Sequence, residues 1–69
     1  MEELEVWATE ENLQAIQRDL EACENFEMFE ELWQIFNKEA IRIASKRIVS
    51  DKGAVIRDWI DKVDNLSYT

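Results

Sequence analysis

An aromatic-rich stretch constrains the fold of this chain more than any other feature. Residues 25–36 read NFEMFEELWQIF, and a helix that turns ~100° per residue places most of their large apolar side chains on one side. These side chains are Phe26, Phe29, Leu32, Trp33 and Phe36. Because an aromatic stripe at helical spacing is typical of a core, we predict that this helix forms the centre of the fold, with Trp33 and the later Trp59 buried.

Apolar spacing and capping residues predict further helices on both sides of this stretch. Thr9, Asn25 and Asn37 are good N-cap residues, and apolar side chains follow each of them at intervals of three or four. The only glycine lies in a predicted turn, residues 50–53. We therefore predict one all-α domain over residues 1–69. It is a small bundle of three to four short helices at about 10–23, 26–36, 38–49 and 53–64, with an extended arm at 1–8 and a frayed tail at 67–69.

The boundary at Asn37 has an alternative, a single helix over residues 26–48 that would be ~35 Å long. The residues that would continue its apolar face are Ala40, Ile43, Ala44 and Ile48. We favour a break because Asn37 is a poor residue for a helix interior and a good cap. Glu39 would then lie in a new first turn, where the helix dipole favours negative charge.

The composition of the chain indicates a cytoplasmic location and argues against an enzyme. The chain of 69 residues has one cysteine, Cys23, and no histidine. A small secreted domain usually carries several disulfides, and the first residues lack the basic start and apolar run of a signal peptide. The sequence contains no phosphate-binding loop, catalytic triad or metal-binding cysteine cluster. We expect a cytoplasmic protein without catalytic activity, cofactor, metal site or membrane span.

The two halves of the chain differ in charge. Residues 1–37 contain eleven Asp and Glu and one Arg, which gives −10, whereas residues 38–69 contain seven Lys and Arg and five Asp and Glu, which gives +2. Negative charge of this density speeds the encounter with a positively charged partner. The carboxylates that we expect to steer this encounter are Glu10, Glu21, Glu24, Glu27, Glu30 and Glu31.

Apolar residues outside the predicted core also indicate that the partner is a protein. Met28 and Ile35 lie beside the main stripe of their helix, and we also place Trp7 and Ile41 on exposed apolar surface. The candidate partner-binding residues are Trp7, Glu24, Glu27, Met28, Glu30, Glu31 and Ile35. We therefore expect a protein-binding adaptor, regulatory subunit or inhibitor whose partner is another protein with a basic surface. A homodimer is a further option.

A row of basic residues favours a different hypothesis. Lys38, Arg42 and Lys46 recur every four residues, so like charges stack along one side of helix 38–49. We expect pairing with the Glu-rich surfaces of the first two helices to offset this repulsion. The alternative is a helix-turn-helix-like module that uses helix 38–49 and turn 50–53 to bind nucleic acid. Its phosphate-binding residues would be Lys38, Arg42, Lys46, Arg47, Lys52 and Arg57.

Net charge separates these hypotheses. The chain carries a formal charge of −8, which repels nucleic acid, and the helix that would read bases contains Asp58, Asp61 and Asp64. Nucleic acid is therefore the less favoured partner. A second alternative is a DNA mimic, in which the carboxylates of the acidic half stand in for phosphates on a nucleic-acid-binding protein.

Overall fold

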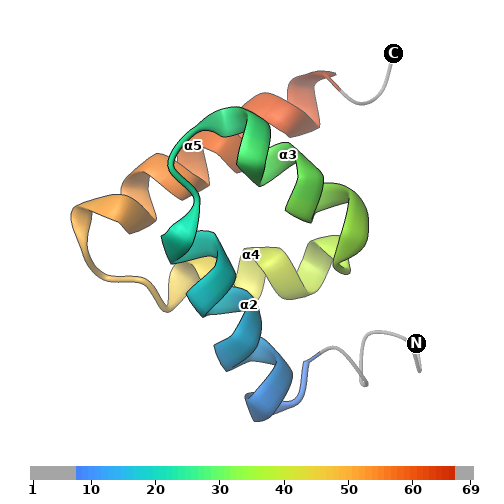
Figure 1. Cartoon of the computed structure of the whole chain (residues 1–69), viewed down its shortest axis with the longest axis vertical. Helices are drawn as coiled ribbons and strands as arrows, with labels where there is room; N and C mark the ends of the chain where they lie inside the picture. The colour runs from blue at the N-terminus through green and yellow to red at the C-terminus, as the bar shows by residue number, and fades with distance from the viewer. Residues whose placement is uncertain (1–7, 67–69) are drawn as a thin grey trace.

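The computed structural model describes residues 8–66. The predicted arm up to residue 7, which includes Trp7, and the predicted tail at 67–69 lie outside the described residues. The described part forms four helices and no strand, which confirms the predicted all-α fold. The helices are α2 (Glu10–Ala22), α3 (Phe26–Ile35), α4 (Lys38–Lys46) and α5 (Asp51–Leu66). Figure 1 shows them around a shared centre, with α2 packed mainly on α4, and α5 on both α3 and α4.

Side-chain caps begin three of the four helices at the predicted residues. Each cap is a side-chain oxygen that accepts a hydrogen bond from the backbone amide three residues later. The three bonds join Thr9 to Asn12 at 3.2 Å, Asn25 to Met28 at 2.9 Å, and Asn37 to Ala40 at 3.1 Å. Phe36 and Asn37 both have extended backbone conformation, so α3 and α4 are separate helices and the predicted break is confirmed.

The core is built from the inner sides of all four helices. Its buried apolar residues are Leu13, Ile16, Leu20, Cys23, Phe29, Trp33, Ala40, Ile41, Ala44, Ile48, Ile56, Ile60 and Val63. Phe29 lies at the centre, with its ring centroid 5.7 Å from Trp33 and 5.8 Å from Trp59. Trp33 is buried as predicted, but Trp59 is only half-buried because it packs at the edge of this cluster, against Phe26 as well.

The rotation of α4 differs from the prediction. Ile41 is completely buried, so its predicted exposure was wrong, whereas Ile43 is 38% exposed. Ile43 was placed on the apolar face of residues 26–36 only in the alternative of a single helix, which the break at Asn37 rules out. Because two extended residues separate α3 from α4, the buried side of α3 does not fix the buried side of α4. Contacts with α2 and α5 decide which side of α4 is buried.

The end of α4 and the start of α5 also differ from the prediction. Helix α4 ends at Lys46, not at residue 49, and α5 begins at Asp51, so Gly53 lies inside the first turn of a helix. No glycine has a positive φ angle, so Gly53 does not serve a left-handed turn. It is buried, and a Cβ atom here would overlap the carbonyl oxygen of Ile48. Glycine is required at this position because the two backbones approach closely.

None of the described helices combines the length and the apolar composition needed to cross a membrane.

The close approach at Gly53 predicts an unusual sign for a helix substitution. In an ordinary helix, Gly→Ala stabilises by about 1 kcal/mol. Gly53→Ala should instead destabilise the fold by about 1–3 kcal/mol, because the added methyl group overpacks against the Ile48 carbonyl. Urea unfolding followed by circular dichroism measures the change. Ala54→Gly, at the exposed neighbouring position, reports the ordinary propensity effect in the same turn. A Gly53→Ala protein more stable than wild type would contradict the packing.

Candidate partner-binding surface

Helix α3 has one buried side and one exposed side. Phe29 and Trp33 face the core, whereas Met28 is 42% exposed and Ile35 is 65% exposed. Helical spacing places the exposed carboxylates of Glu27 and Glu31 next to these two apolar side chains. This side, which we call the α3 outer face, consists of Glu27, Met28, Glu31 and Ile35. It combines apolar contact area with negative charge.

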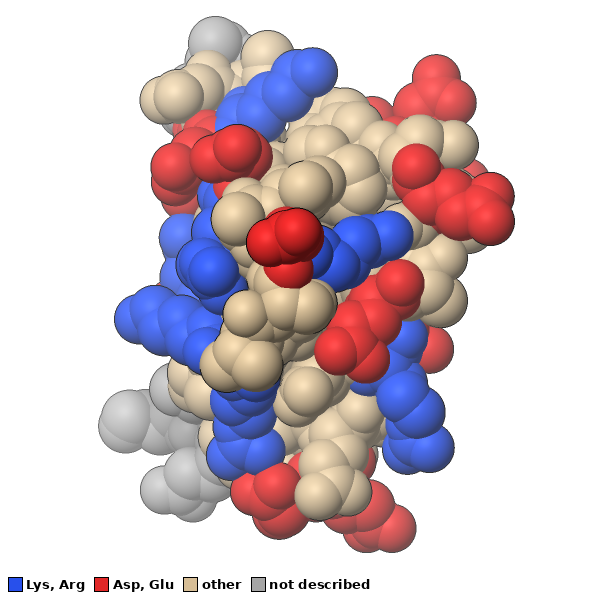
Figure 2. All heavy atoms as spheres, turned by 90° about the vertical axis from the view of Figure 1, so that its left-hand side faces the viewer, with Lys and Arg blue, Asp and Glu red and all other residues tan. Residues whose placement is uncertain are grey.

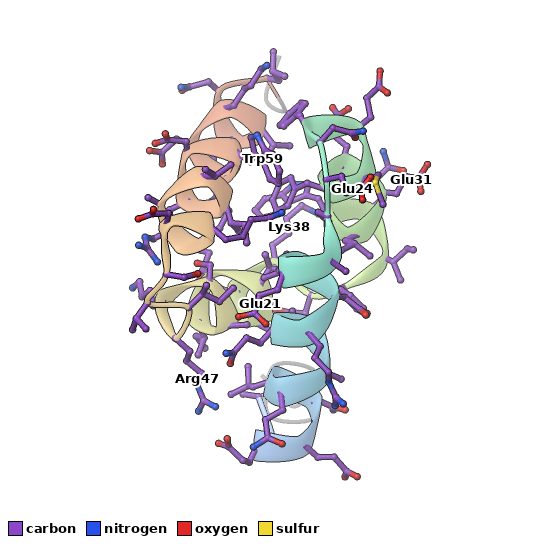
Figure 3. All side chains as sticks on the ribbon, turned by 60° about the vertical axis from the view of Figure 1, so that its left-hand side comes forward. Glu21, Glu24, Glu31, Lys38, Arg47 and Trp59 are labelled. Carbon is purple, nitrogen blue, oxygen red and sulfur yellow. The ribbon has the colours of Figure 1, made fainter. Side chains whose placement is uncertain are left out.

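The other predicted partner-binding residues are placed differently. Glu24 is exposed in the connection between α2 and α3, and Figure 3 shows it on the same side of the molecule as Glu31. Glu30 is half-buried, so it is less available than the carboxylates of the α3 outer face. Trp7 lies outside the described residues. The structure therefore brings together four of the predicted residues on one helix, and Glu24 lies on the same side of the molecule.

A hollow of about 240 Å³ lies between the last turn of α2 and α3. We call it the α2–α3 hollow, and its lining residues are Asp19, Ala22, Cys23, Met28, Glu31 and Leu32. Met28 and Glu31 also belong to the α3 outer face, so the two features are continuous. Sequence reasoning did not select Asp19, Ala22 or Leu32. Their grouping depends on how α2 packs against α3, which the spacing within each helix does not specify.

Cys23 is a buried structural residue in this hollow. Its side chain is buried, and its Sγ donates to the backbone oxygen of Asp19 at 3.5 Å. Burial raises the pKa of the Cys23 thiol, and the charge of Asp19 adds to this increase against an opposing effect of Lys52. The thiol is therefore protonated at neutral pH, and this residue does not provide a reactive thiolate.

Arg42, in the predicted basic row, pairs with α5. Its guanidinium donates two hydrogen bonds to the carboxylate of Asp64, each 2.9 Å long, and it also lies 3.2 Å from Glu39. The guanidinium carbon is 5.4 Å from the Trp33 ring centroid, close enough for a cation–π contact. The expected partner on the first two helices was wrong for Arg42, because α4 turns this residue towards α5. Lys46 has no ion-pair partner among residues 8–66.

Lys52, Arg47 and Arg57 also make contacts within the fold. Arg47, which was not part of the predicted basic row, forms a bidentate pair with Glu10 at the start of α2, at 2.7 and 3.0 Å. Lys52 donates to the backbone oxygen of Cys23, just after α2 ends. Arg57 donates to the oxygens of Ser45 and Ile48, at 2.8 and 3.3 Å. These two α5 side chains therefore cap the C-terminal ends of earlier helices.

These contacts weaken the nucleic-acid hypothesis. On the face drawn in Figure 2, basic side chains gather along one side, but acidic side chains lie beside and between them. Four of the six candidate phosphate-binding residues donate to a carboxylate or to a backbone carbonyl of the same chain. They are Arg42, Arg47, Lys52 and Arg57. A phosphate would have to compete with these internal acceptors.

The described residues also contain no group of three His, Cys, Asp or Glu side chains that could hold a metal ion. Comparisons of the chain with protein-family models, with curated proteins and with solved structures find no match. The geometry of the described residues is therefore the observation from which a function can be argued.

The different surroundings of Arg42 and Lys46 predict different effects of charge reversal. Arg42→Glu should lower the melting temperature, because it replaces the Asp64 pair with two like charges. Lys46→Glu should leave the melting temperature near that of wild type, because this side chain is exposed and has no partner to lose. Calorimetry of the two variants provides the comparison, and each is the charge-matched control of the other.

Equal destabilisation by the two variants would show that total charge matters more than the Arg42–Asp64 pair. Binding of duplex DNA at low salt by wild type, but not by Lys46→Glu, would restore the nucleic-acid hypothesis.

The Arg42–Asp64 pair also predicts a pH dependence. The hydrogen bond from Arg42 lowers the pKa of Asp64, so the folded state binds a proton less readily than the unfolded chain. The pair therefore stabilises the fold above the ordinary Asp pKa of about 3.9, and this stabilisation is lost as pH falls through the lower folded pKa. Wild type should exceed Asp64→Asn in urea midpoint at neutral pH and lose that advantage as pH falls through the folded pKa of Asp64. A difference that stays constant with pH would contradict this account.

Proposed function

We propose that this chain is a non-catalytic, cytoplasmic protein-binding module, an adaptor or inhibitor, that holds a basic partner protein on the α3 outer face. The observation that carries the proposal is the exposure of Met28 and Ile35 on a helix whose other side packs in the core. Both side chains lie on one face of α3, where a surface helix usually carries polar residues. Exposed apolar side chains that lie together are typical of interaction sites.

The charge of this face indicates the chemistry of the partner. Glu27 and Glu31 lie on the α3 outer face, Glu24 lies nearby, and none of the three has an ion-pair partner among the described residues. Unpaired carboxylates around apolar side chains complement a surface that carries Lys or Arg around apolar residues. The exposed apolar side chains favour the protein-binding hypothesis over the DNA-mimic hypothesis. A mimic of phosphates needs charge at these positions and gains nothing from Ile35.

Separate variants test how charge and apolar contact each contribute to binding of the partner. Glu27→Gln with Glu31→Gln should slow association several-fold and make it less sensitive to salt, because both charges steer the encounter. Ile35→Ser should instead speed dissociation, because it removes apolar contact. Affinity capture from the source cells identifies the partner, and binding kinetics with the purified partner at low and high salt measure both effects.

Matched controls keep the test specific. Glu11→Gln with Asp58→Asn removes the same charge from exposed positions on α2 and α5. Val49→Ser removes an apolar side chain that is 95% exposed, in the connection between α4 and α5. Both controls should bind the partner as wild type does. If the α3 variants capture and release the same partner at wild-type rates, the α3 outer face is not the binding site.

A further inference from the structure

The α2–α3 hollow has apolar walls and a carboxylate on each of its two helices. Ala22, Met28 and Leu32 contribute the apolar walls, Asp19 extends from the last turn of α2, and Glu31 extends from α3. A carboxylate on each helix and apolar surface between them match one type of side chain, a long aliphatic stem that ends in a positive charge. Lysine and arginine bury such stems on apolar surface while the charged end stays among polar groups.

The end of α2 adds a second, independent preference for positive charge. The C-terminal end of a helix carries partial negative charge, and basic residues in the last turn normally complement it. The last turn of α2 contains no basic residue, and it includes the acidic Asp19 and Glu21. Lys52 reaches this end from α5 and donates to the Cys23 carbonyl. Lys52 thus supplies one positive charge to a helix end that carries two carboxylates, Asp19 and Glu21, so the end keeps a net negative charge that a further cation would offset.

We propose that the α2–α3 hollow is a subsite for a lysine or arginine side chain of the partner. This inference rests on the proposed function, because it names the group that the partner inserts next to the α3 outer face. The stem lies on Met28 and Leu32, and the charged end lies between Asp19 and Glu31. The volume of about 240 Å³ accommodates a single side chain of this length.

Other ligands match the hollow less well. A calcium ion takes six to eight oxygen ligands, whereas this hollow offers two carboxylates among apolar walls. A phosphate or an acidic peptide would meet Asp19, Glu31 and the negative end of α2 together. An uncharged apolar side chain would bury contact area but leave both carboxylates unpaired. A cationic side chain satisfies the apolar walls and the carboxylates at once.

The experiment uses the full chain, labelled with nitrogen-15, and a capped five-residue peptide that has a central lysine between leucines. A second peptide carries arginine at the centre, and a third carries side-chain-acetylated lysine, which keeps the stem and removes the charge. Titration with the first two should shift the amide signals of Ala22, Cys23, Met28 and Leu32. The acetylated peptide should bind at least about fivefold more weakly, since this removes a charge-assisted contact.

Variants of the two carboxylates complete the test. Asp19→Asn with Glu31→Gln should weaken binding of the lysine peptide to the level of the acetylated peptide. Glu11→Gln with Asp58→Asn, which has the same net charge, should bind as wild type does. A melting curve for each variant establishes that it is folded. Equal binding of the charged and acetylated peptides, unchanged binding by the Asp19/Glu31 variant, or no shift at the hollow at the highest soluble concentration would each overturn the proposal.

The outcomes also separate this inference from the proposed function. Ile35→Ser leaves the lining of the hollow intact, so it should still bind the lysine peptide while it releases the partner faster. If Ile35→Ser impairs partner binding but the hollow does not bind the peptide, the proposed function stands and the subsite is wrong. If the hollow binds the peptide but the α3 variants hold the partner normally, the proposed function is wrong and the hollow is a cation subsite without that partner.

Discussion

The fold depends on how closely the first turn of α5 packs against the ends of α4 and α2. Gly53 has no Cβ, so the backbone of α5 can approach the Ile48 carbonyl. From this position Lys52 reaches the Cys23 carbonyl, and Arg57 donates to two carbonyls at the end of α4. The last carbonyls of a helix lack partners within that helix, and its dipole makes this end negative. The first two turns of α5 therefore supply positive charge and hydrogen-bond donors to two other helix ends.

This arrangement decides which charges remain on the surface. Four of the eight basic residues are engaged within the fold, in the ion pairs Arg42–Asp64 and Arg47–Glu10 or in helix capping by Lys52 and Arg57 of α5. The carboxylates of α3 have no ion-pair partner among the described residues. The uneven charge of the sequence thus becomes an uneven surface, with carboxylates left beside exposed Met28 and Ile35. That combination supports a basic protein as the partner more than nucleic acid.

Local patterns predicted most of the fold and part of the candidate site. Thr9, Asn25 and Asn37 each cap a helix through an amide only three residues away, so their effect depends on the neighbouring sequence alone. The exposed positions of Met28 and Ile35 also followed from helical spacing, since both lie away from the aromatic stripe of their own helix. The α2–α3 hollow could not be predicted in this way, because two helices form it together.

The sequence by itself determined the helical class and where three of the four described helices begin, because capping and apolar spacing act within one or two turns. Only the tertiary structure decided which side of α4 is buried, with Ile41 inward and Ile43 outward. It also decided that Arg42 pairs with Asp64, 22 residues later, and that Gly53 packs inside a helix instead of forming a turn. These features depend on how separate helices pack against one another, and the extended residues Phe36 and Asn37 end the spacing pattern of α3 before α4 begins.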